Sequence, residues 1–388
     1  MKKTYLLTPG PTPIPEVVSS IFARPLIHHR TPAFQSLFED VRAGLKYVYQ
    51  TKQEVLTLAT SGTGAMDAAI CNLFRKGDKI ISVNGGKFGG RWAKIAAAYG
   101  VECVELKVAW GDSCEASDVE ALVKLHTDAK AICFQASETS TGVCMPTQEI
   151  TALAKKYGML SVCDAITACG VFDLPMDAWG IDVLITGAQK AMMIPPGLAF
   201  IALSDAAWAA NEKSDLPRFY LDLARERKAQ VKNQTAWTPA TSLLQGLQES
   251  LRMIREEGLH NVFKRHELLA RATRNAVGAL GLEILAKKRP SPAVTSVLVP
   301  PSIIARGEGK LIPKTMRDKY GVTIAGGQDE QEGKIFRLSH FGYCDKFDIT
   351  TGISCLELVL NDLGYPVEFG RGVGAALKTF AENGKANS

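Results

Sequence analysis

The sequence Val183-Leu184-Ile185-Thr186-Gly187-Ala188-Gln189-Lys190 joins an apolar, β-branched run to a glycine and a lysine. A run that is apolar at consecutive positions is typical of a strand buried on both faces. Similar runs alternate with stretches of helical periodicity from about residue 50 to residue 205, which predicts an α/β fold with a mostly parallel sheet covered by helices. The seven strands predicted for this sheet are Val55–Thr60, Lys79–Val83, Glu102–Val108, Ala131–Ala136, Leu160–Asp164, Val183–Thr186 and Leu198–Leu203.

The pattern changes beyond residue 240. Apolar residues from Leu243 to Ile254 recur at three- and four-residue spacing, which predicts that residues 241–280 form a long helical connector to a second domain. A chain of 388 residues also exceeds the roughly 250 at which a single hydrophobic core stops growing. The elements predicted beyond the connector are the strands Ala293–Val299, Val322–Ala325 and Ile335–Leu338 and the helix Ile349–Leu363.

We therefore expect four parts along the chain. They are an N-terminal arm that contributes to the active site (residues 1–20), a large domain with the seven-stranded sheet (21–255), a smaller C-terminal α+β domain (256–365) and a tail (366–388). The tail ends in polar residues, and we expect it to fray.

The composition is that of an ordinary globular protein, with 46% apolar and 22% charged residues. The 45 basic and 40 acidic residues give a net charge of +5 without a long basic run, so we expect neither nucleic acid nor a membrane as a partner. The nine cysteines are irregularly spaced and include no C-x-x-C pair, which argues against a metal centre and indicates a reduced, cytoplasmic protein. The N-terminal apolar run is too short for a signal peptide, and no stretch is long enough to span a bilayer.

The segment Thr60-Ser61-Gly62-Thr63-Gly64-Ala65 follows a predicted strand and opens a helix. Free backbone N–H groups and the positive end of the helix dipole at such a junction favour an anion, ideally a phosphate. The pattern is neither G-x-G-x-x-G nor a P-loop, so it does not favour a dinucleotide or a nucleoside triphosphate. Taken alone, it is equally compatible with a tight turn and a helix cap.

Two further residues follow predicted strands. Asp164 closes the strand Leu160–Asp164, and ligands of open α/β sheets gather at the carboxyl ends of strands, although a lone aspartate there also serves as a helix cap. Lys190 lies among small and apolar residues in a segment that contains Pro195 and Pro196. Poor solvation lowers the pKa of such a lysine and makes its amine available for Schiff-base chemistry, whereas the alternative is an amine that reaches solvent.

A phosphate-binding turn, a carboxylate and a buried lysine are together the groups that pyridoxal 5'-phosphate (PLP) requires. The sequence resembles the class V aminotransferases of PLP fold type I, most closely the alanine-glyoxylate and serine-glyoxylate (serine-pyruvate) aminotransferases. The resemblance covers roughly residues 5–365, and its most specific part surrounds Lys190. The motifs that carry it are Thr8-Pro9-Gly10-Pro11-Thr12, His28-His29-Arg30, Ser61-Gly62-Thr63-Gly64, Asn84-Gly85, Glu138-Thr139-Ser140-Thr141-Gly142-Val143, Asp164, Gly187-Ala188-Gln189-Lys190, Ile194-Pro195-Pro196-Gly197, Gly326-Gly327-Gln328 and Lys334-Ile335-Phe336-Arg337.

The resemblance implies roles for individual residues at the cofactor. Lys190 would form the Schiff base and then move the proton between the substrate α-carbon and the cofactor, and Asp164 would pair with the protonated pyridine nitrogen. Phe88 would stack on the ring, unless it is a core residue. Ser140 would approach the cofactor, unless it only caps its loop. The other cofactor contacts implied are Ile166 and, at the phosphate, Thr63, Gly64, Ala65 through its backbone alone, and Gln189.

The resemblance also implies how substrate and subunits meet. Arg337 would bind the substrate α-carboxylate through a two-pronged hydrogen-bond pair, for which a guanidinium is suited. The turn that contains Gly10 would lie over the substrate. Thr238 would reach the phosphate of a neighbouring subunit, so that a homodimer shares its active sites.

The activity implied is a PLP-dependent transamination from alanine or serine to glyoxylate or pyruvate, with ping-pong kinetics. Alternatives are another small donor such as ureidoglycine, a β-eliminating lyase, or a non-catalytic subunit that keeps the fold. A cysteine desulfurase is disfavoured, because the surroundings of its only candidate, Cys344, do not match that family. The donor and acceptor pair, the choice between dimer and tetramer and the roles of His28, His29 and His340 stay open.

Overall fold

The computed structural model describes residues 3–386, so residues 1–2 of the predicted arm and 387–388 of the predicted tail lie outside the described residues. Its largest sheet has seven strands, and they are the seven predicted from the sequence. In this sheet β10 runs antiparallel to both neighbours, and the other pairs are parallel. In spatial order the strands are β2 (Val55–Leu58), β10 (Ala199–Leu203), β9 (Val183–Gly187), β8 (Leu160–Asp164), β5 (Ala131–Gln135), β3 (Lys79–Asn84) and β4 (Glu102–Lys107).

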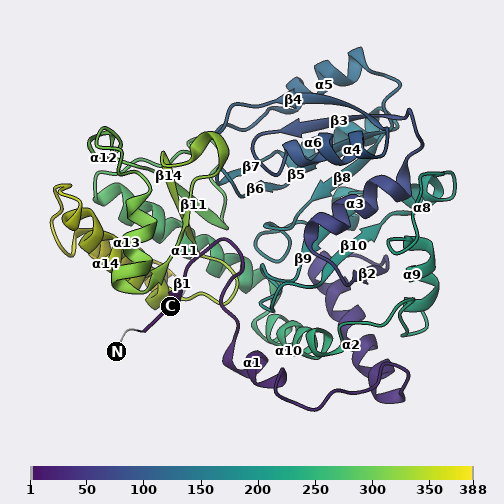
Figure 1. Cartoon of the computed structure of the whole chain (residues 1–388), viewed down its shortest axis with the longest axis horizontal. Helices are drawn as coiled ribbons and strands as arrows, with labels where there is room; N and C mark the ends of the chain where they lie inside the picture. Colours follow the sequence, from purple (N-terminus) through teal and green to yellow (C-terminus); the bar gives the residue numbers. More distant parts are fainter. Residues whose placement is uncertain (1–2, 387–388) are drawn as a thin grey trace.

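Helices cover both faces of this sheet (Figure 1), as the consecutive apolar residues of its strands predict. Val55 and Leu56 are neighbours in β2 but belong to two different hydrophobic clusters, because alternate side chains of a strand point to opposite faces. No helix within residues 3–386 is both long and apolar enough to cross a membrane. The first cluster includes residues of α1 (Glu16–Ile21), α2 (Pro32–Tyr49), α5 (Ala116–Leu125), α6 (Thr147–Lys156), α7 (Met176–Trp179) and α10 (Thr241–Glu257), and the second includes residues of α3 (Gly62–Leu73), α4 (Gly90–Ala98), α8 (Asp205–Asn211) and α9 (Leu223–Gln230).

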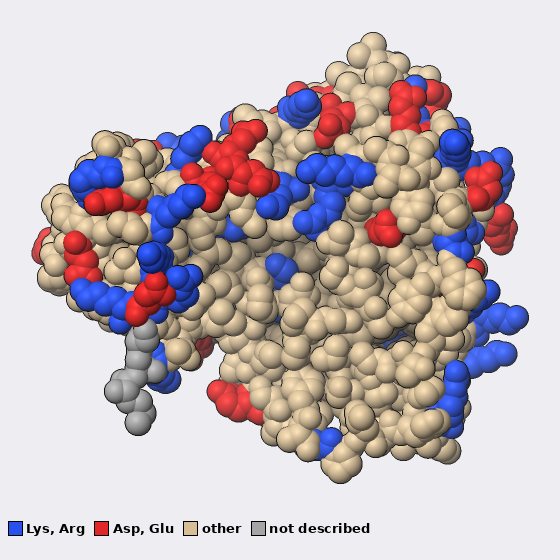
Figure 2. All heavy atoms as spheres, viewed as in Figure 1, with Lys and Arg blue, Asp and Glu red and all other residues tan. Residues whose placement is uncertain are grey.

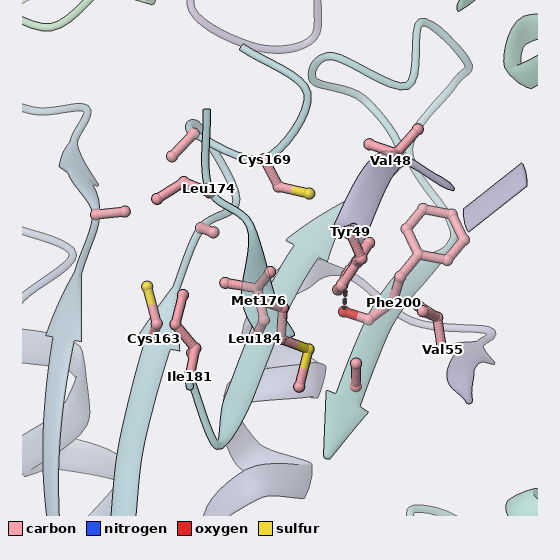
Figure 3. Packing of buried hydrophobic residues seen from close by; sticks show 14 of the residues in the cluster. Val48, Tyr49, Val55, Cys163, Cys169, Leu174, Met176, Ile181, Leu184 and Phe200 are labelled. Carbon is pink, nitrogen blue, oxygen red and sulfur yellow. Dashed lines mark hydrogen bonds between the residues drawn. The ribbon is translucent and has the colours of Figure 1, made fainter. Parts of the chain in front are cut away.

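The end of α2 shows how a helix is fixed on the sheet (Figure 3). Tyr49 is fully buried, and its hydroxyl donates a hydrogen bond of 2.9 Å to the carbonyl oxygen of Phe200 in β10. At the other end, Pro32 occupies the first helical position, and the Thr31 side chain accepts a hydrogen bond from the amide of Phe34. Because the buried hydroxyl is satisfied, the aromatic ring packs in the core without leaving an unpaired polar group.

A second core lies in the C-terminal part of the chain. Its sheet has three antiparallel strands in the order β11-β14-β13, and a separate parallel pair joins β1 of the N-terminal arm to β12. The strands of this part are β1 (Tyr5–Leu6), β11 (Val294–Leu298), β12 (Val322–Thr323), β13 (Ala325–Gly326) and β14 (Ile335–Ser339), and its helices are α11 (Leu259–Ala279), α12 (Pro301–Ile304), α13 (Leu311–Tyr320), η1 (Asp329–Gln331), α14 (Lys346–Asp362) and α15 (Arg371–Ala386). A short hairpin of the large part contains β6 (Ser137–Glu138) and β7 (Val143–Cys144).

Three features of the C-terminal half differ from the prediction. The expected connector is two helices, because Gly258 has a φ of 81° that ends α10 before α11 begins. The expected strand Val322–Ala325 is divided at Ile324 into β12 and β13, which belong to different sheets. The tail does not fray over residues 371–386, because it forms α15, and the buried side chain of Glu357 accepts a 2.8 Å hydrogen bond from the amide of Gly372 in its first turn.

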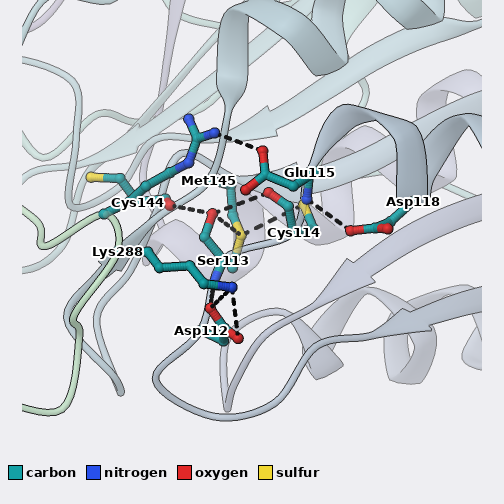
Figure 4. Close-up of polar contacts among 9 residues, drawn as sticks. Asp112, Ser113, Cys114, Glu115, Asp118, Cys144, Met145 and Lys288 are labelled. Carbon is teal, nitrogen blue, oxygen red and sulfur yellow. Dashed lines mark hydrogen bonds and ion pairs between the residues drawn. The ribbon is translucent and has the colours of Figure 1, made fainter.

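The two parts of the chain also meet at the loop before α5 (Figure 4). Lys288 pairs with Asp112 at 3.1 Å, and Arg289 pairs with Glu115 at 2.9 Å. The carbonyl oxygen of Arg289 accepts a hydrogen bond of 2.8 Å from the amide of Cys144. Ion pairs between exposed side chains contribute little stability, so we assign them an orienting role.

Candidate active site

Loops that follow five strands supply polar side chains to one cavity. The carboxyl ends of β2, β3, β5, β8 and β9 lie at the same edge of the sheet, because these strands run in one direction. Figure 2 shows that the surface is hollowed between the two parts of the molecule, with Lys and Arg side chains around the hollow. The residues that line the cavity are Ser61, Gly62, Thr63, Phe88, Arg91, Ser137, Thr139, Asp164, Ile166, Thr167, Gln189 and Lys190.

Lys190 lies in this cavity, three residues after the end of β9. Its side chain is buried, and its Nζ donates a hydrogen bond to the carbonyl oxygen of Pro9. Burial lowers the pKa of Lys190 to about 8; the negative charge of Asp164 opposes this shift, and the charges of Arg337 and Arg91 add to it. The structure therefore confirms that the amine is poorly solvated, and the alternative of an amine in open solvent is wrong.

Asp164 is the last residue of β8 and lines the same cavity. Burial raises the pKa of its carboxyl to about 7, and the nearby charge of Glu138 acts in the same direction. Its Oδ1 accepts a hydrogen bond of 2.9 Å from the amide of Ile166, which also lines the cavity. The carboxyl thus lies close enough to Lys190 for each group to affect the pKa of the other.

The N-terminal arm lies against Lys190. The amide of Thr12 donates to the carbonyl oxygen of Gln189 at 3.1 Å, and the Thr12 hydroxyl donates to that of Lys190 at 2.9 Å. The arm is also bonded to the C-terminal part of the chain through Leu7. The Leu7 amide donates to the carbonyl oxygen of Thr323, and the Leu7 carbonyl accepts from the amide of Ser339. The arm therefore links the segment of the lysine to the strands of the C-terminal sheet.

Gly10 is required by this arrangement, and we expect Gly10→Ala to reduce kcat/KM about 100-fold. Gly10 has a φ of +130°, and a Cβ there would lie 2.2 Å from Lys190 Nζ. The added methyl group would therefore displace the amine from its position in the cavity. The measurement is steady-state kinetics together with a melting curve.

A matched control separates this clash from backbone strain. Gly158 also has a positive φ, of +67°, but nothing lies within 4 Å of a Cβ at that position. Gly158→Ala should lower the melting temperature while kcat/KM stays near that of the wild type. Equal kinetics for the two variants would contradict the role of Gly10.

The first turn of α3 faces the cavity with Ser61, Gly62 and Thr63. The amides of Gly64 and Ala65 already donate to the carbonyl oxygen of Ser61, at 2.8 and 3.3 Å. The amides of Gly62 and Thr63 have no partner within the helix, because they belong to its first residues. Of the predicted phosphate contacts on this turn, Thr63 lines the cavity, whereas Gly64 and Ala65 are not among the lining residues, so their roles stay predictions.

Phe88 and Ser140 are held together by Glu138, a buried carboxyl in β6. Glu138 accepts hydrogen bonds from the amides of Phe88 (3.2 Å) and Gly89 (2.8 Å) and from the amide and hydroxyl of Ser140 (3.0 and 2.5 Å). Burial raises the pKa of Glu138, and these four donors act against that shift. Phe88 lines the cavity, and Ser140 lies in the supporting loop behind it.

Arg337 is a buried residue of β14. Its Nε donates to the carbonyl oxygen of Gly326 at 3.0 Å, and its Nη1 donates to that of Thr139 at 2.9 Å. Burial lowers the pKa of Arg337 to about 10, opposed by the charge of Glu138. These bonds fix the guanidinium beside the loop of Thr139, which lines the cavity.

Other candidates lie away from the cavity in the single chain. Thr238 lines a different pocket, next to Trp237, and His340 is buried with its Nε2 2.9 Å from the hydroxyl of Thr295. His28 and His29 contact each other with ring centroids 4.6 Å apart in the segment between α1 and α2. The roles of these residues stay predictions.

Two charged residues at the site were not assigned a role from the sequence. One is Glu138, which stands inside a quoted motif; its place between an apolar strand and a run of hydroxyl residues was the available signal. The other is Arg91, whose Nη1 donates to the Thr63 hydroxyl at 2.7 Å and whose guanidinium carbon lies 4.8 Å from the centroid of the Phe88 ring. The only local feature of the sequence that could have indicated a role for Arg91 at the site is its position three residues after Phe88, at the start of a helix.

Comparisons with known proteins agree on one family. A family model described as aminotransferase class-V matches residues 4–329. The chain is 40% identical over 378 residues to "Soluble hydrogenase, small subunit" of Synechococcus sp. (strain PCC 6716), with 96% of this chain and 97% of that protein covered. It is 32% identical over 388 residues to the L-aspartate–glyoxylate aminotransferase of Paracoccus denitrificans (97% and 96% covered) and 34% identical over 389 residues to the serine–glyoxylate aminotransferase of Arabidopsis thaliana (96% and 94%).

A solved structure gives the same result for the fold. The ureidoglycine-glyoxylate aminotransferase of Bacillus subtilis superposes with a TM-score of 0.93 at 26% identity, covering 98% of this chain and 99% of that one. The predicted PLP-dependent transferase fold and the predicted transaminase activity are thereby confirmed. The chain belongs to the class V aminotransferases.

Proposed function

We propose that this aminotransferase uses PLP to move an amino group from a small amino acid, alanine or serine, to a small 2-oxo acid such as glyoxylate or pyruvate. Class V enzymes are PLP-dependent, and the cofactor supplies an electron-withdrawing ring that carries the amino group between the substrates. The observation that carries the proposal is the buried amine of Lys190 and the buried carboxyl of Asp164 on the walls of one cavity.

The residues present fit this cofactor. Gln189 lines the cavity, and its Oε1 is buried without a hydrogen-bond partner in the described part of the chain, so this amide keeps hydrogen-bonding capacity for a polar ligand. The free amides at the start of α3 suit a phosphate. Asp164, at the end of β8, suits a protonated ring nitrogen, since a cationic partner favours the ionised carboxyl.

The amine of Lys190 has the properties that Schiff-base chemistry requires. A lysine with its usual pKa of 10.5 is unprotonated in about one molecule in 3,000 at pH 7, whereas a pKa of about 8 raises this to about one in 11. The Nζ donates to the carbonyl oxygen of Pro9, which orients the nucleophile. The lowered pKa makes the same amine easier to deprotonate. With the cofactor bound, the same Nζ would also hold and move the proton at the substrate α-carbon.

Arg337 is the group that we propose to bind the substrate α-carboxylate. Carbonyl oxygens accept from its Nε and Nη1, and its Nη2 keeps donors for a carboxylate. The names of the relatives support the acceptor: the enzymes from Paracoccus, Arabidopsis and Bacillus share glyoxylate and differ in the donor. We therefore propose glyoxylate as the principal acceptor.

We further propose a homodimer whose partner subunit brings Thr238 to the phosphate. Trp237, the residue before Thr238, contacts the rings of Phe219 and Tyr220. These two side chains are 68% and 46% exposed. Exposed aromatic groups of this kind mark protein interfaces. Figure 2 shows few charged side chains on the lower face, over α1, α2 and α10, which supports an interface there.

The test is the visible absorption spectrum of the protein with PLP, before and after alanine, serine, aspartate or ureidoglycine is added, followed by glyoxylate. We expect a coloured form that bleaches with alanine or serine and returns with glyoxylate. Bleaching with aspartate or ureidoglycine alone would replace the proposed donor but keep the cofactor. A protein that never develops the coloured form would contradict the proposal and favour a non-catalytic subunit.

A further inference from the structure

Arg91 brings a guanidinium to the wall of the cavity and has no role in the proposed function. It lies in the first turn of α4 and lines the cavity together with Lys190 and Asp164. Its Nη1 donates to the Thr63 hydroxyl at 2.7 Å, and its guanidinium carbon lies 4.8 Å from the centroid of the Phe88 ring. These contacts place its charge between the start of α3 and the aromatic wall.

No carboxylate forms an ion pair with Arg91 in the described part of the chain. Within residues 3–386 its side-chain contacts are one hydroxyl and one aromatic ring, neither of which carries a negative charge. A guanidinium has five N–H donors, so most of them stay available for a ligand. The positive charge extends into the cavity, because it lowers the pKa of both Lys190 and Asp164.

The two arginines of the site are held differently. Arg337 is bonded to two backbone carbonyls, one of them that of Thr139, which lines the cavity. Arg91 is bonded to Thr63, a residue of the α3 turn with an amide that lacks a partner in the helix. An oxyanion at this turn would therefore meet backbone donors, the Thr63 hydroxyl and a full positive charge together.

We propose that Arg91 binds the phosphate group of the cofactor. The inference deepens the proposed function and rests on it, since it assigns the recognition of the phosphate to a residue that local motifs do not reveal. The chain's own geometry supports the phosphate over a substrate carboxylate, because the contact of Arg91 is with the first turn of α3 rather than with the loops around Arg337.

The test compares the affinities of cofactor-free protein for PLP and for pyridoxal, which lacks the phosphate. For Arg91→Gln we expect the Kd of PLP to rise about 10- to 100-fold, as for the loss of hydrogen bonds between charged groups, and the Kd of pyridoxal to change less than about twofold. Arg91→Lys keeps the charge and should recover part of the loss. Arg371→Gln, which removes the same charge from an exposed ion pair with Glu368, is the matched control and should leave both Kd values unchanged.

A second readout uses inorganic phosphate and needs no cofactor. Phosphate should raise the melting temperature of the cofactor-free wild type above that in chloride of equal ionic strength, and Arg91→Gln should abolish this rise. Equal losses of PLP and pyridoxal affinity would overturn the proposal. So would a loss of turnover confined to aspartate as donor, because Arg91 would then bind a substrate carboxylate and not the phosphate. A wild type that binds phosphate but not PLP would contradict the proposed function, whereas unchanged PLP binding by Arg91→Gln would contradict the role of Arg91 alone.

Discussion

Lys190→Ala is expected to reduce kcat by about 10⁴-fold or more and to abolish covalent attachment of the cofactor, while the fold is retained. The amine is both the proposed nucleophile and the proposed base, and no other lysine among residues 3–386 lines the cavity. The change removes a buried charged group, so the melting temperature of the cofactor-free protein should not fall. Borohydride reduction in the presence of PLP, followed by mass spectrometry of the peptide with residue 190, measures the attachment.

A lysine outside the site is the control for this experiment. Lys52 is exposed, and its removal by Lys52→Ala changes the net charge by the same amount. That variant should keep wild-type turnover and the label on Lys190. Normal transamination by Lys190→Ala, or a label on another lysine of the wild type, would contradict the assignment.

Asp164→Asn is expected to lower kcat about 10²- to 10³-fold, because it removes the charge proposed to stabilise the protonated ring. The same change should stabilise the cofactor-free protein. Burial raises the pKa of this carboxyl from 3.8 to about 7, so the folded state holds the proton more tightly than the unfolded state. The wild type therefore loses stability as the pH rises from 3.8 through about 7. The Asp164→Asn variant has no ionising carboxyl at this position, so its stability does not fall for this reason.

Melting curves of the two proteins without cofactor measure this difference. The melting temperature of Asp164→Asn should exceed that of the wild type by an amount that grows between about pH 5 and about pH 8. A difference independent of pH would contradict a buried, ionising carboxyl at this position. Loss of activity with unchanged PLP affinity and spectrum would contradict its pairing with the ring.

The strands of the large sheet could be predicted because each is apolar at consecutive positions, a local property of the sequence. The errors arose where a single residue or a distant partner decides the structure. Gly258 divides the predicted connector through its positive φ. The start of α15 is stabilised by Glu357, whose partner Gly372 lies 15 positions further along the chain. The division at Ile324 depends on β1, which comes from the other end of the chain and pairs with β12.

The same distinction explains what was predicted of the site. Asp164 is the last residue of a buried strand and Lys190 lies three residues after another, so their position at the ligand edge of the sheet follows from strand direction. The partners that adjust them do not follow from any local pattern. Pro9 meets Lys190 across 181 positions, and Glu138 meets Gly89 across 49, so only the folded chain brings these groups together.

The N-terminal arm has a consequence for the order in which the enzyme matures during its synthesis. Leu7 and Thr12 are made first, but their partners include Thr323 and Ser339, near the other end of the chain. The arm can therefore complete its contacts only after Ser339 has emerged from the ribosome. Until then only the contacts of Thr12 with Gln189 and Lys190 hold the arm at the lysine, so a nascent or prematurely terminated chain has the lysine without the full support of its Pro9 acceptor.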